Sequence, residues 1–487
     1  MKWYVFLTAT VCLLLSVYSA KLKITLYLVV FLACAAVFGF FIFKKSFQKG
    51  MAVCLAVIAM FSIFSINYIN SINKIINADG KKVYLSAVVC ENEEQRDANK
   101  TRTCTLKILS SDNDLLKRSE KVRLYYDAED ELKLGTKIDG EFTIVANDKL
   151  SFLSVGIRCF LRIENVRFSD SKIFLYDFCE TVQSYIKETL LNKTRNSALL
   201  IAMLSGERGF ISPMLENYVK TCGVSHILVV SGLHFSIICG AFMKLCNLLF
   251  KRQVVKDIIF LLFIFCFAAV CGFSVSVLRV GVIYAVMIIY KKLNRLDNSL
   301  VGFCDALIVV LFINPMAFHS VSFQLSFSAT LGLLVLYPYL QRAIYYRYNN
   351  RVMLSLLLKS SATTLSACVF TFPTCVYYFG WVSVVSIPVN IVIGFAVTVI
   401  LICISSGVVM AAVGMSFLEK TLFFISDAFA DYFVKVIKVF SEFPFATIRF
   451  RNTETLTACV LVVYLFIFVL YTCKRYKFLI KSKLKEE

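Results

Sequence analysis

The side chains best suited to chemistry lie in residues 225–240, inside an apolar run that is long enough to enter a membrane. This stretch contains Ser231 and two of the three histidines of the chain, His226 and His234. An unsatisfied polar group in hydrocarbon costs several kcal/mol, so a helix surrounded by lipid has no use for such residues. Polar residues at membrane depth usually face a bundle interior, a cavity or a substrate path. We therefore take residues 225–240 as the candidate functional centre.

A serine beside two histidines suggests nucleophilic catalysis, as in an intramembrane serine protease. His226 and His234 are about 80° apart around a helix, so both cannot easily serve Ser231. Two residues before Ser231 stands Val229, where a tight nucleophile turn has glycine. The sequence also contains no His-Glu-x-x-His zinc motif and no Gly-x-x-x-x-Gly-Lys phosphate-binding loop. We therefore expect a chain without catalytic residues, metal or cofactor.

The composition is that of a membrane protein. Of the 487 residues, 59% are hydrophobic and only 17% are charged, whereas soluble domains have about a quarter charged residues. The net charge is +20, and most acidic residues lie between residues 79 and 180. The basic excess therefore falls on the membrane part, where the positive-inside rule explains it more simply than an anionic substrate does.

The apolar runs predict a polytopic α-helical membrane protein with about ten or eleven transmembrane helices. Basic clusters on every second loop place the C-terminus in the cytoplasm. The chain then divides into N-terminal helices at 1–70, an extracytoplasmic domain at 71–180, a connector at 181–225, a pore domain at 226–473 and a basic tail at 474–487. The apolar segments are residues 3–20, 24–43, 51–69, 226–250, 257–272, 275–290, 299–314, 321–340, 354–379, 384–410, 422–440 and 456–471.

Residues 71–180 are the one clearly hydrophilic segment, and apolar residues alternate there in several short runs. Alternation with a period of two predicts half-buried strands. A turn in residues 134–142 leads into a further strand. Five or so short strands within about a hundred residues suit a small barrel such as an OB-fold. The alternating residues are Val83, Leu85, Ala87 and Val89, then Cys104, Leu106 and Ile108, then Val122, Leu124 and Tyr126.

Three side chains on the outward parity of these strands are candidates for nucleic-acid binding. OB-folds often bind single strands through aromatic and basic side chains, and Tyr84, Arg123 and Tyr125 are of these types. The alternative is an ordinary solvated strand face, and the near-neutral charge of the segment favours that alternative.

Most of the 18 cysteines lie in apolar helices, where cysteine behaves as a small hydrophobic residue. Cys90 and Cys104 belong to the hydrophilic segment. If that segment lies outside the cytoplasm, an oxidising environment permits a disulfide there. Our preferred pair is Cys90 with Cys104.

The connector contains short helical segments that cannot cross a membrane alone. Residues 182–191 and 196–207 are amphipathic. Ser212 followed by Pro213 predicts the start of another short helix, with the serine as its cap. We expect these segments to be interfacial or re-entrant.

Polar residues interrupt several later spans. Arg279 lies just inside the outer end of a helix, where it either snorkels to the interface or contacts phosphate. Gln324 lies within another apolar segment. Pro388 and Asn390 interrupt a third, and broken helices in membranes often border a pathway.

Residues 422–440 carry a charged face. Asp427, Asp431, Lys435 and Lys438 lie on one side of the expected helix. This helix is therefore expected to pack against polar partners or to lie at an interface.

Residues 223–234, Gly-Val-Ser-His-Ile-Leu-Val-Val-Ser-Gly-Leu-His, resemble the signature of the ComEC family of competence DNA-uptake channels. Residues 272–279, Asn314-Pro315 followed by residues 321–327, and residues 387–390 resemble further motifs of that family. Their order and spacing also match, as does the hydrophilic insert after the N-terminal helices. The resemblance covers nearly the whole chain.

That family is associated with passing one DNA strand across the cytoplasmic membrane of bacteria during natural transformation. The resemblance implies an extracytoplasmic OB-like domain, a helical pore domain in the bilayer, single-stranded DNA as the transported molecule, and a separate DNA receptor. Many members add a C-terminal metallo-β-lactamase-like domain, but this sequence has no His-x-His-x-Asp-His motif and about fourteen residues after its last apolar segment. We therefore expect a separate nuclease, and also a cytoplasmic ATPase because the chain has no phosphate-binding loop.

Under this interpretation, four residues are candidates for the DNA pathway, with Arg279 pairing with phosphate. Two more, His226 and Gly232, are expected to shape the start of the helix, with the glycine allowing close approach of a neighbour. Pro388 and Asn390 are expected to be structural. A secondary transporter of small anions is the alternative, although no inverted repeat is visible. The candidate pathway residues are Ser231, His234, Arg279 and Gln324.

Overall fold

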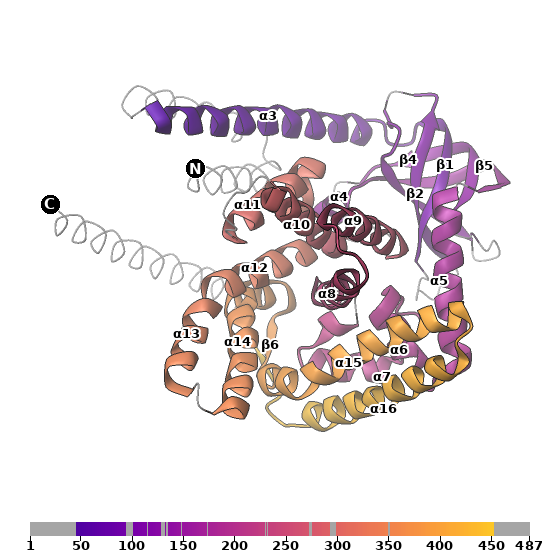
Figure 1. Ribbon diagram of the computed structural model, residues 1–487. Coiled ribbons are helices and arrows are strands. Elements are labelled where there is room, and N and C mark those ends of the chain that lie inside the picture. Colours follow the sequence, from indigo (N-terminus) through magenta and orange to yellow (C-terminus); the bar gives the residue numbers. More distant parts are fainter. Residues whose placement is uncertain are drawn as a thin grey trace. The chain divides into compact units, whose positions relative to one another are not determined.

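The computed structural model (Figure 1) describes the chain from Lys45 to Arg451 with short gaps. The predicted helices at 3–20, 24–43 and 456–471 and the tail at 474–487 lie outside the described residues. The chain separates into two compact units, which are described one at a time. The first comprises Met1–Ile211, His226–Phe323 and Ala396–Asp431, and the second comprises Ser212–Ser225, Gln324–Phe395 and Tyr432–Glu487. The residues described are 45–93, 101–113, 115–127, 132, 135–147, 149–172, 174–228, 230, 232–271, 275–292, 299–348 and 351–451.

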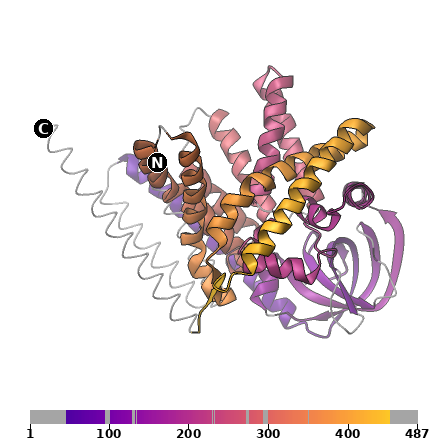
Figure 2. The same cartoon turned by 90° about the horizontal axis from the view of Figure 1, so that it is seen from below.

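The first unit contains the predicted small barrel, whose strands curve around an enclosed core (Figure 2). Its strands are hydrogen-bonded in the order β1-β2-β3-β5-β4, and β4 returns to β1 to close it. All neighbours are antiparallel except β3 and β5, which are parallel. A five-stranded barrel of this kind is the architecture of an OB-fold. The strands are β1 (Lys82–Glu93), β2 (Thr101–Ser111), β3 (Lys121–Asp127), β4 (Thr136–Val145) and β5 (Ile157–Lys172).

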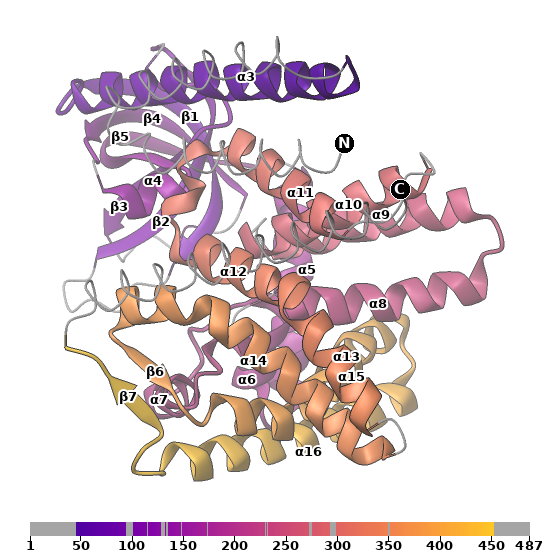
Figure 3. The ribbon, with the colours of Figure 1, turned by 90° about the vertical axis from the view of Figure 1, so that its left-hand side faces the viewer.

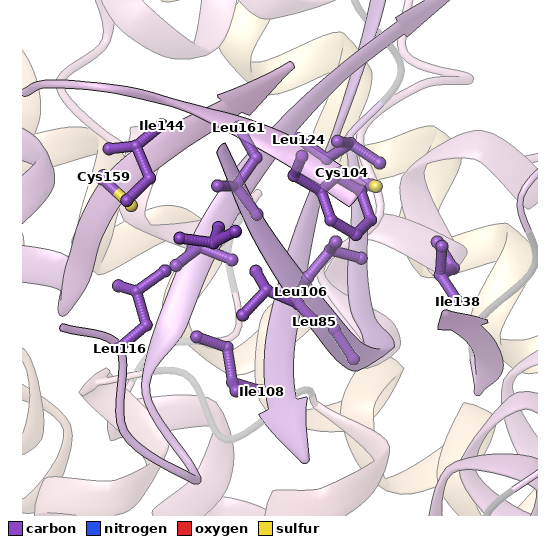
Figure 4. Packing of buried hydrophobic residues seen from close by; sticks show 14 of the residues in the cluster. Leu85, Cys104, Leu106, Ile108, Leu116, Leu124, Ile138, Ile144, Cys159 and Leu161 are labelled. Carbon is purple, nitrogen blue, oxygen red and sulfur yellow. The ribbon is translucent and has the colours of Figure 1, made fainter. Parts of the chain in front are cut away.

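The apolar residues that alternate in the sequence fill this barrel, as predicted. All ten belong to one buried core cluster. Figure 4 shows Leu85, Leu106 and Leu124 gathered within the barrel, together with Leu161 from β5. Side chains alternate between the two faces of a strand. A shift of one residue in the pairing of a strand with its neighbour would therefore expose all the core residues of that strand. The core therefore fixes the register, and with it the residues that face outward.

Cys90 and Cys104 are both thiols in the structure, and the disulfide between them stays a prediction. The pairing of β1 with β2 is irregular between Val89 and Glu91, and Cys104 lies opposite Asn92. Cys90 therefore has no direct cross-strand position opposite Cys104. Its thiol instead lies 3.5 Å from the carbonyl oxygen of Val88, to which it donates.

The buried barrel thiols Cys104 and Cys159 should resist alkylation in the native protein. Burial raises the pKa of both from 9.0 to about 12, and only the thiolate reacts. At about pH 8, mass spectrometry after iodoacetamide treatment should find both unmodified in folded protein and modified after denaturation. Unfolded thiols ionise at lower pH than these folded ones, so the barrel should lose stability as pH rises from about 9 to about 12. Rapid modification of either thiol in native protein would contradict this.

The helix α3 (Lys45–Ile76) leads directly into the barrel (Figure 3) and is held to it by Arg158 of β5. The Arg158 side chain is only 9% exposed. Its guanidinium lies 3.7 Å from the ring centroid of Tyr68 and donates to Ser71 Oγ at 3.1 Å. It also forms a 3.0 Å ion pair with Glu120. One buried arginine therefore joins the end of this helix to two parts of the barrel.

Helices complete the first unit. The aromatic rings of α8 and α9 stack closely, with the centroids of Phe242 and Phe263 3.9 Å apart. The predicted span 226–250 is instead a short 3-10 turn, Ser225–Ile227, followed by a helix that begins only at Gly232. The helices are α4 (Leu150–Val155), α5 (Phe174–Lys193), α6 (Ser197–Ser205), α8 (Gly232–Leu249), α9 (Gln253–Val270), α10 (Val275–Lys292) and α11 (Ser299–Ile313), followed by the 3-10 helix η2 (Pro315–His319).

The second unit has two close approaches that depend on glycine. A Cβ at Gly332 of α12 would clash with the backbone carbonyl oxygen of Ser366 in α14. Gly223 has a φ of +70°, and a Cβ there would lie 2.7 Å from Ser383.

Ser212 caps its helix by accepting from Leu215 N, as predicted. The elements are α7 (Pro213–Thr221), most of α12 (Val321–Val335), α13 (Tyr337–Tyr348), α14 (Val352–Phe379) and the two-stranded sheet of β6 (Trp381–Ser383) and β7 (Thr447–Arg449).

The helices α15 (Ser386–Val413) and α16 (Ser416–Ser441) each contribute to both units. The predicted interruption of a span at Pro388 is wrong, because Pro388 lies in the first turn of α15, which continues to Val413. Proline is tolerated there, since the first N–H groups of a helix have no partner within it. Pro373, by contrast, lies in the interior of α14.

Three helical stretches among the described residues are long and apolar enough to cross a bilayer. Two shorter apolar helices accompany them, at His234–Leu249 and Gly302–Ile313. These stretches and the barrel agree with the prediction of a membrane protein that has a barrel domain. The number of transmembrane helices and their direction across the bilayer stay predictions. The long stretches are Val321–Tyr348, Val352–Phe379 and Ser386–Val413.

Candidate functional site

The histidine motif is built around His234 in the first turn of α8. Its side chain is fully buried and lies close to the backbone of Met203 in α6. Next to it, a Cβ at Gly232 would lie 3.0 Å from Val280 of α10. A larger residue at position 232 would therefore crowd the Val280 side chain. The motif thus joins three helices, α6, α8 and α10.

The two histidines differ in burial in a way that the sequence did not indicate. His226, expected to shape the helix start, lies exposed in the 3-10 turn. His234, expected to line a pathway, is enclosed by protein. The sequence could not show this difference, because the turn at Ser225–Ile227 ends the helical periodicity between them.

The other predicted pathway residues fall in both units. Arg279 lies in α10 of the first unit, but its side chain is outside the part described, as is all of Ser231. Gln324 belongs to the second unit, where its Nε2 donates to the Tyr378 hydroxyl of α14 at 3.0 Å. Asn390 of the second unit donates to the carbonyl of Ser386 at 2.7 Å, within its own helix. The described residues contain no group of three histidine, cysteine or acidic side chains that could hold a metal.

The helix α6 is held at its N-terminal end by acidic residues of α16. The carboxylate of Asp427 accepts from the backbone N–H groups of Arg195 and Asn196, both at 3.0 Å. Asp431 accepts from the Asn196 side chain at 2.8 Å and pairs with Arg195 at 3.2 Å. The polar partners expected for this face of the helix are therefore present at both carboxylates.

This arrangement connects the carboxylates to the histidine motif through α6. Residues 199–204 of α6 are all buried. At its C-terminal end Gly206 adopts a left-handed φ of +85°, and a Cβ there would lie 3.3 Å from Val230. The N-terminal end of α6 meets Asp427 while its last turns meet Val230 and His234. We therefore expect Asp427 to act on the motif through the position of α6.

Asn314 of the Asn-Pro motif holds the barrel to the helices of the first unit. Its Nδ2 donates to the carbonyl oxygens of Leu153 at 3.2 Å and Ser154 at 2.9 Å, near the end of α4. Its Oδ1 accepts from Met316 N at 3.0 Å and so caps η2. One side chain therefore caps one helix and satisfies the last carbonyls of another.

The three surface candidates of the barrel separate into two places. Tyr84 lies on β1, 54% exposed, opposite Glu141 of β4. Arg123 and Tyr125 lie on β3 beside β5. The structure therefore brings two of the three together.

A family model described as Competence protein matches residues 203–476, more than half of the chain. The chain is 25% identical over 224 residues to ComE operon protein 3 of Bacillus subtilis. The aligned region covers 46% of this chain and 27% of that protein. It is 27% identical over 161 residues to Recombination protein 2 of Haemophilus influenzae, covering 31% of this chain and 20% of that protein. The matched regions thus span about a quarter of these relatives or less. No solved structure matches the chain.

The family match begins at Met203, beside His234, and includes the histidine motif, the Asn314 contact and the Asp427 carboxylate. These are the residues that join the helices of the first unit to one another and to the barrel. This chain is a member of the competence protein family.

Proposed function

We propose that this chain forms the passage by which single-stranded DNA crosses the cytoplasmic membrane of a bacterium during natural transformation. The observation that carries the proposal is the family match over residues 203–476. The apolar helices supply a part that fits the bilayer. The barrel supplies a water-soluble part that is held to the helices by Asn314.

In this proposal the barrel lies outside the cytoplasm and receives the strand, and the C-terminus lies inside. A separate receptor delivers the DNA, a separate nuclease removes the second strand and a cytoplasmic ATPase drives transport. The need for a separate ATPase follows from the sequence, which has no Gly-x-x-x-x-Gly-Lys loop. The alternative is a secondary transporter of small anions, in which broken helices often form the binding site. The helix expected to be broken at Pro388 is α15, which is continuous from Ser386 to Val413.

Uptake of labelled duplex DNA tests the proposal. Strains with the gene, without it, and with it restored are exposed to labelled DNA and then to external DNase. We expect the deletion to abolish DNase-protected label in the cytoplasm while label bound at the cell surface stays unchanged. Restoration of the gene should restore protection. Equal protection in all strains would overturn the proposal.

A further inference from the structure

The outer surface of β3 and β5 carries aromatic and basic side chains in alternating positions. Tyr125 of β3 is paired with Arg162 of β5, and Arg123 of β3 is paired with Phe160 of β5. Paired residues share a face of the sheet, and the neighbours of opposite parity fill the core. Phe152 of α4 adjoins them. We call these residues the β3–β5 face: Arg123, Tyr125, Phe152, Phe160 and Arg162.

The three rings of the β3–β5 face form a continuous chain. The centroids of Tyr125 and Phe160 are 5.3 Å apart, and those of Phe160 and Phe152 are 5.0 Å apart, both edge to face. The guanidinium of Arg123 lies 5.3 Å from the Phe152 centroid. Tyr125 is 38% exposed at one end of the chain, whereas Phe152 and Phe160 are half-buried. Packing thus orients the outermost ring and leaves part of it open to a ligand.

Acidic residues near this face already have partners. Glu164, two residues beyond Arg162, accepts from the Thr143 hydroxyl at 2.7 Å and lies 3.6 Å from Lys82. The Thr143 hydrogen bond, the Lys82 charge and, as the smallest contribution, the Arg162 charge hold the pKa of Glu164 below its usual value, so it stays ionised. Glu120 pairs with Arg158. Arg162 is exposed beside Tyr125, where it can meet an anion.

We propose that the β3–β5 face binds single-stranded DNA, with a base stacked on Tyr125 and phosphates paired with Arg162 and Arg123. This inference rests on the proposed function, because it names the surface that receives the strand. Tyr125 and Phe160 each have an arginine two residues away on their own strand and another opposite them on the neighbouring strand. A base-stacking group thus lies next to a phosphate-binding group, as single-stranded nucleic acid requires. A lipid chain or an apolar peptide would not require basic side chains between the aromatic ones.

The position of the face also gives a route. Its last ring, Phe152, belongs to α4, and the carbonyls near the end of α4 are bound by Asn314 beside η2. A strand that follows the rings from Tyr125 to Phe152 is therefore delivered to the Asn-Pro motif of the first unit.

Fluorescence anisotropy tests this with the purified full-length protein in detergent and a labelled oligo-dT strand. Tyr125→Ala should weaken binding about tenfold, the size expected for loss of one stacked base, and Tyr125→Phe should bind like the wild type. Arg162→Gln should weaken binding and reduce the slope of log affinity against log salt by about 0.7, as loss of one phosphate contact predicts. Tyr185→Ala is the matched control and should change nothing, because Tyr185 lies on α5, outside the barrel, and is as exposed as Tyr125 (37% against 38%).

Protection of Cys104 and Cys159 from alkylation shows that each variant barrel is folded. No binding of oligo-dT by the wild type, tighter binding of a duplex of the same length, or equal losses in Tyr185→Ala and Tyr125→Ala would each overturn the inference. The uptake experiment separates it from the proposed function. Normal uptake without the gene would overturn the proposed function. Gene-dependent uptake together with unchanged oligo-dT binding in Tyr125→Ala and Arg162→Gln would overturn only the proposed DNA binding by the β3–β5 face.

Discussion

Replacing Asp427 by alanine should lower the free energy of unfolding by about 3 kcal/mol, a range typical for lost hydrogen bonds to a buried charged group. The Asp427 carboxylate is 5% exposed and accepts from two backbone N–H groups at the start of α6. Without it both donors lose their partner. Because α6 has only nine residues, it has little helical stability of its own. Denaturant titration of the purified protein in detergent measures the change.

Asp431→Ala is the matched control for Asp427→Ala, since both carboxylates lie on the same helix and contact the same two residues. The Asp431 and Arg195 side chains are 42% and 71% exposed, and exposed ion pairs contribute at most about 1 kcal/mol. Asp431→Ala should therefore cost much less. DNA uptake should fall in Asp427→Ala, because α6 positions Val230 and His234. Equal destabilisation by the two substitutions would show that the hydrogen bonds from Arg195 N and Asn196 N to Asp427 contribute no more to stability than the exposed contacts of Asp431 do.

Replacing Asn314 by aspartate should loosen the barrel from the helices of the first unit while leaving η2 capped. Aspartate keeps the oxygen that accepts from Met316 N, but it cannot donate to the carbonyls of Leu153 and Ser154. Loss of two hydrogen bonds amounts to about 2 kcal/mol, which raises the opened fraction roughly thirtyfold. Hydrogen–deuterium exchange should accelerate in α4 and η2, and DNA uptake should fall.

Asn314→Ala separates the two roles of this side chain. Alanine removes the cap as well as both donated hydrogen bonds, so exchange at Met316 N should rise further than in Asn314→Asp. The interior of the barrel, reported by Cys104, should stay protected in both variants, because its core is closed by its own strands. Unchanged exchange in α4 of Asn314→Asp would show that the two donated hydrogen bonds do not hold the barrel.

The sequence determined those features that depend on local periodicity. Alternation with a period of two identified the inward residues of the barrel, from Val83 to Tyr126, because successive strand residues face opposite sides. Ser212 and Pro213 marked the start of α7 because helix caps are short-range. Long apolar runs indicated a membrane protein, and the charged face of residues 422–440 indicated polar partners.

The tertiary structure decided which distant residues meet. Asn314 reaches Leu153 across 161 residues of sequence, and Asp427 reaches Arg195 across 232. The pairing of Tyr125 with Arg162 depends on the parallel register of β3 and β5. Neither composition nor period specifies such pairs, because they depend on how complete elements pack. For the same reason the burial of His234, the exposure of His226 and the continuity of α15 past Pro388 emerged only from the folded chain.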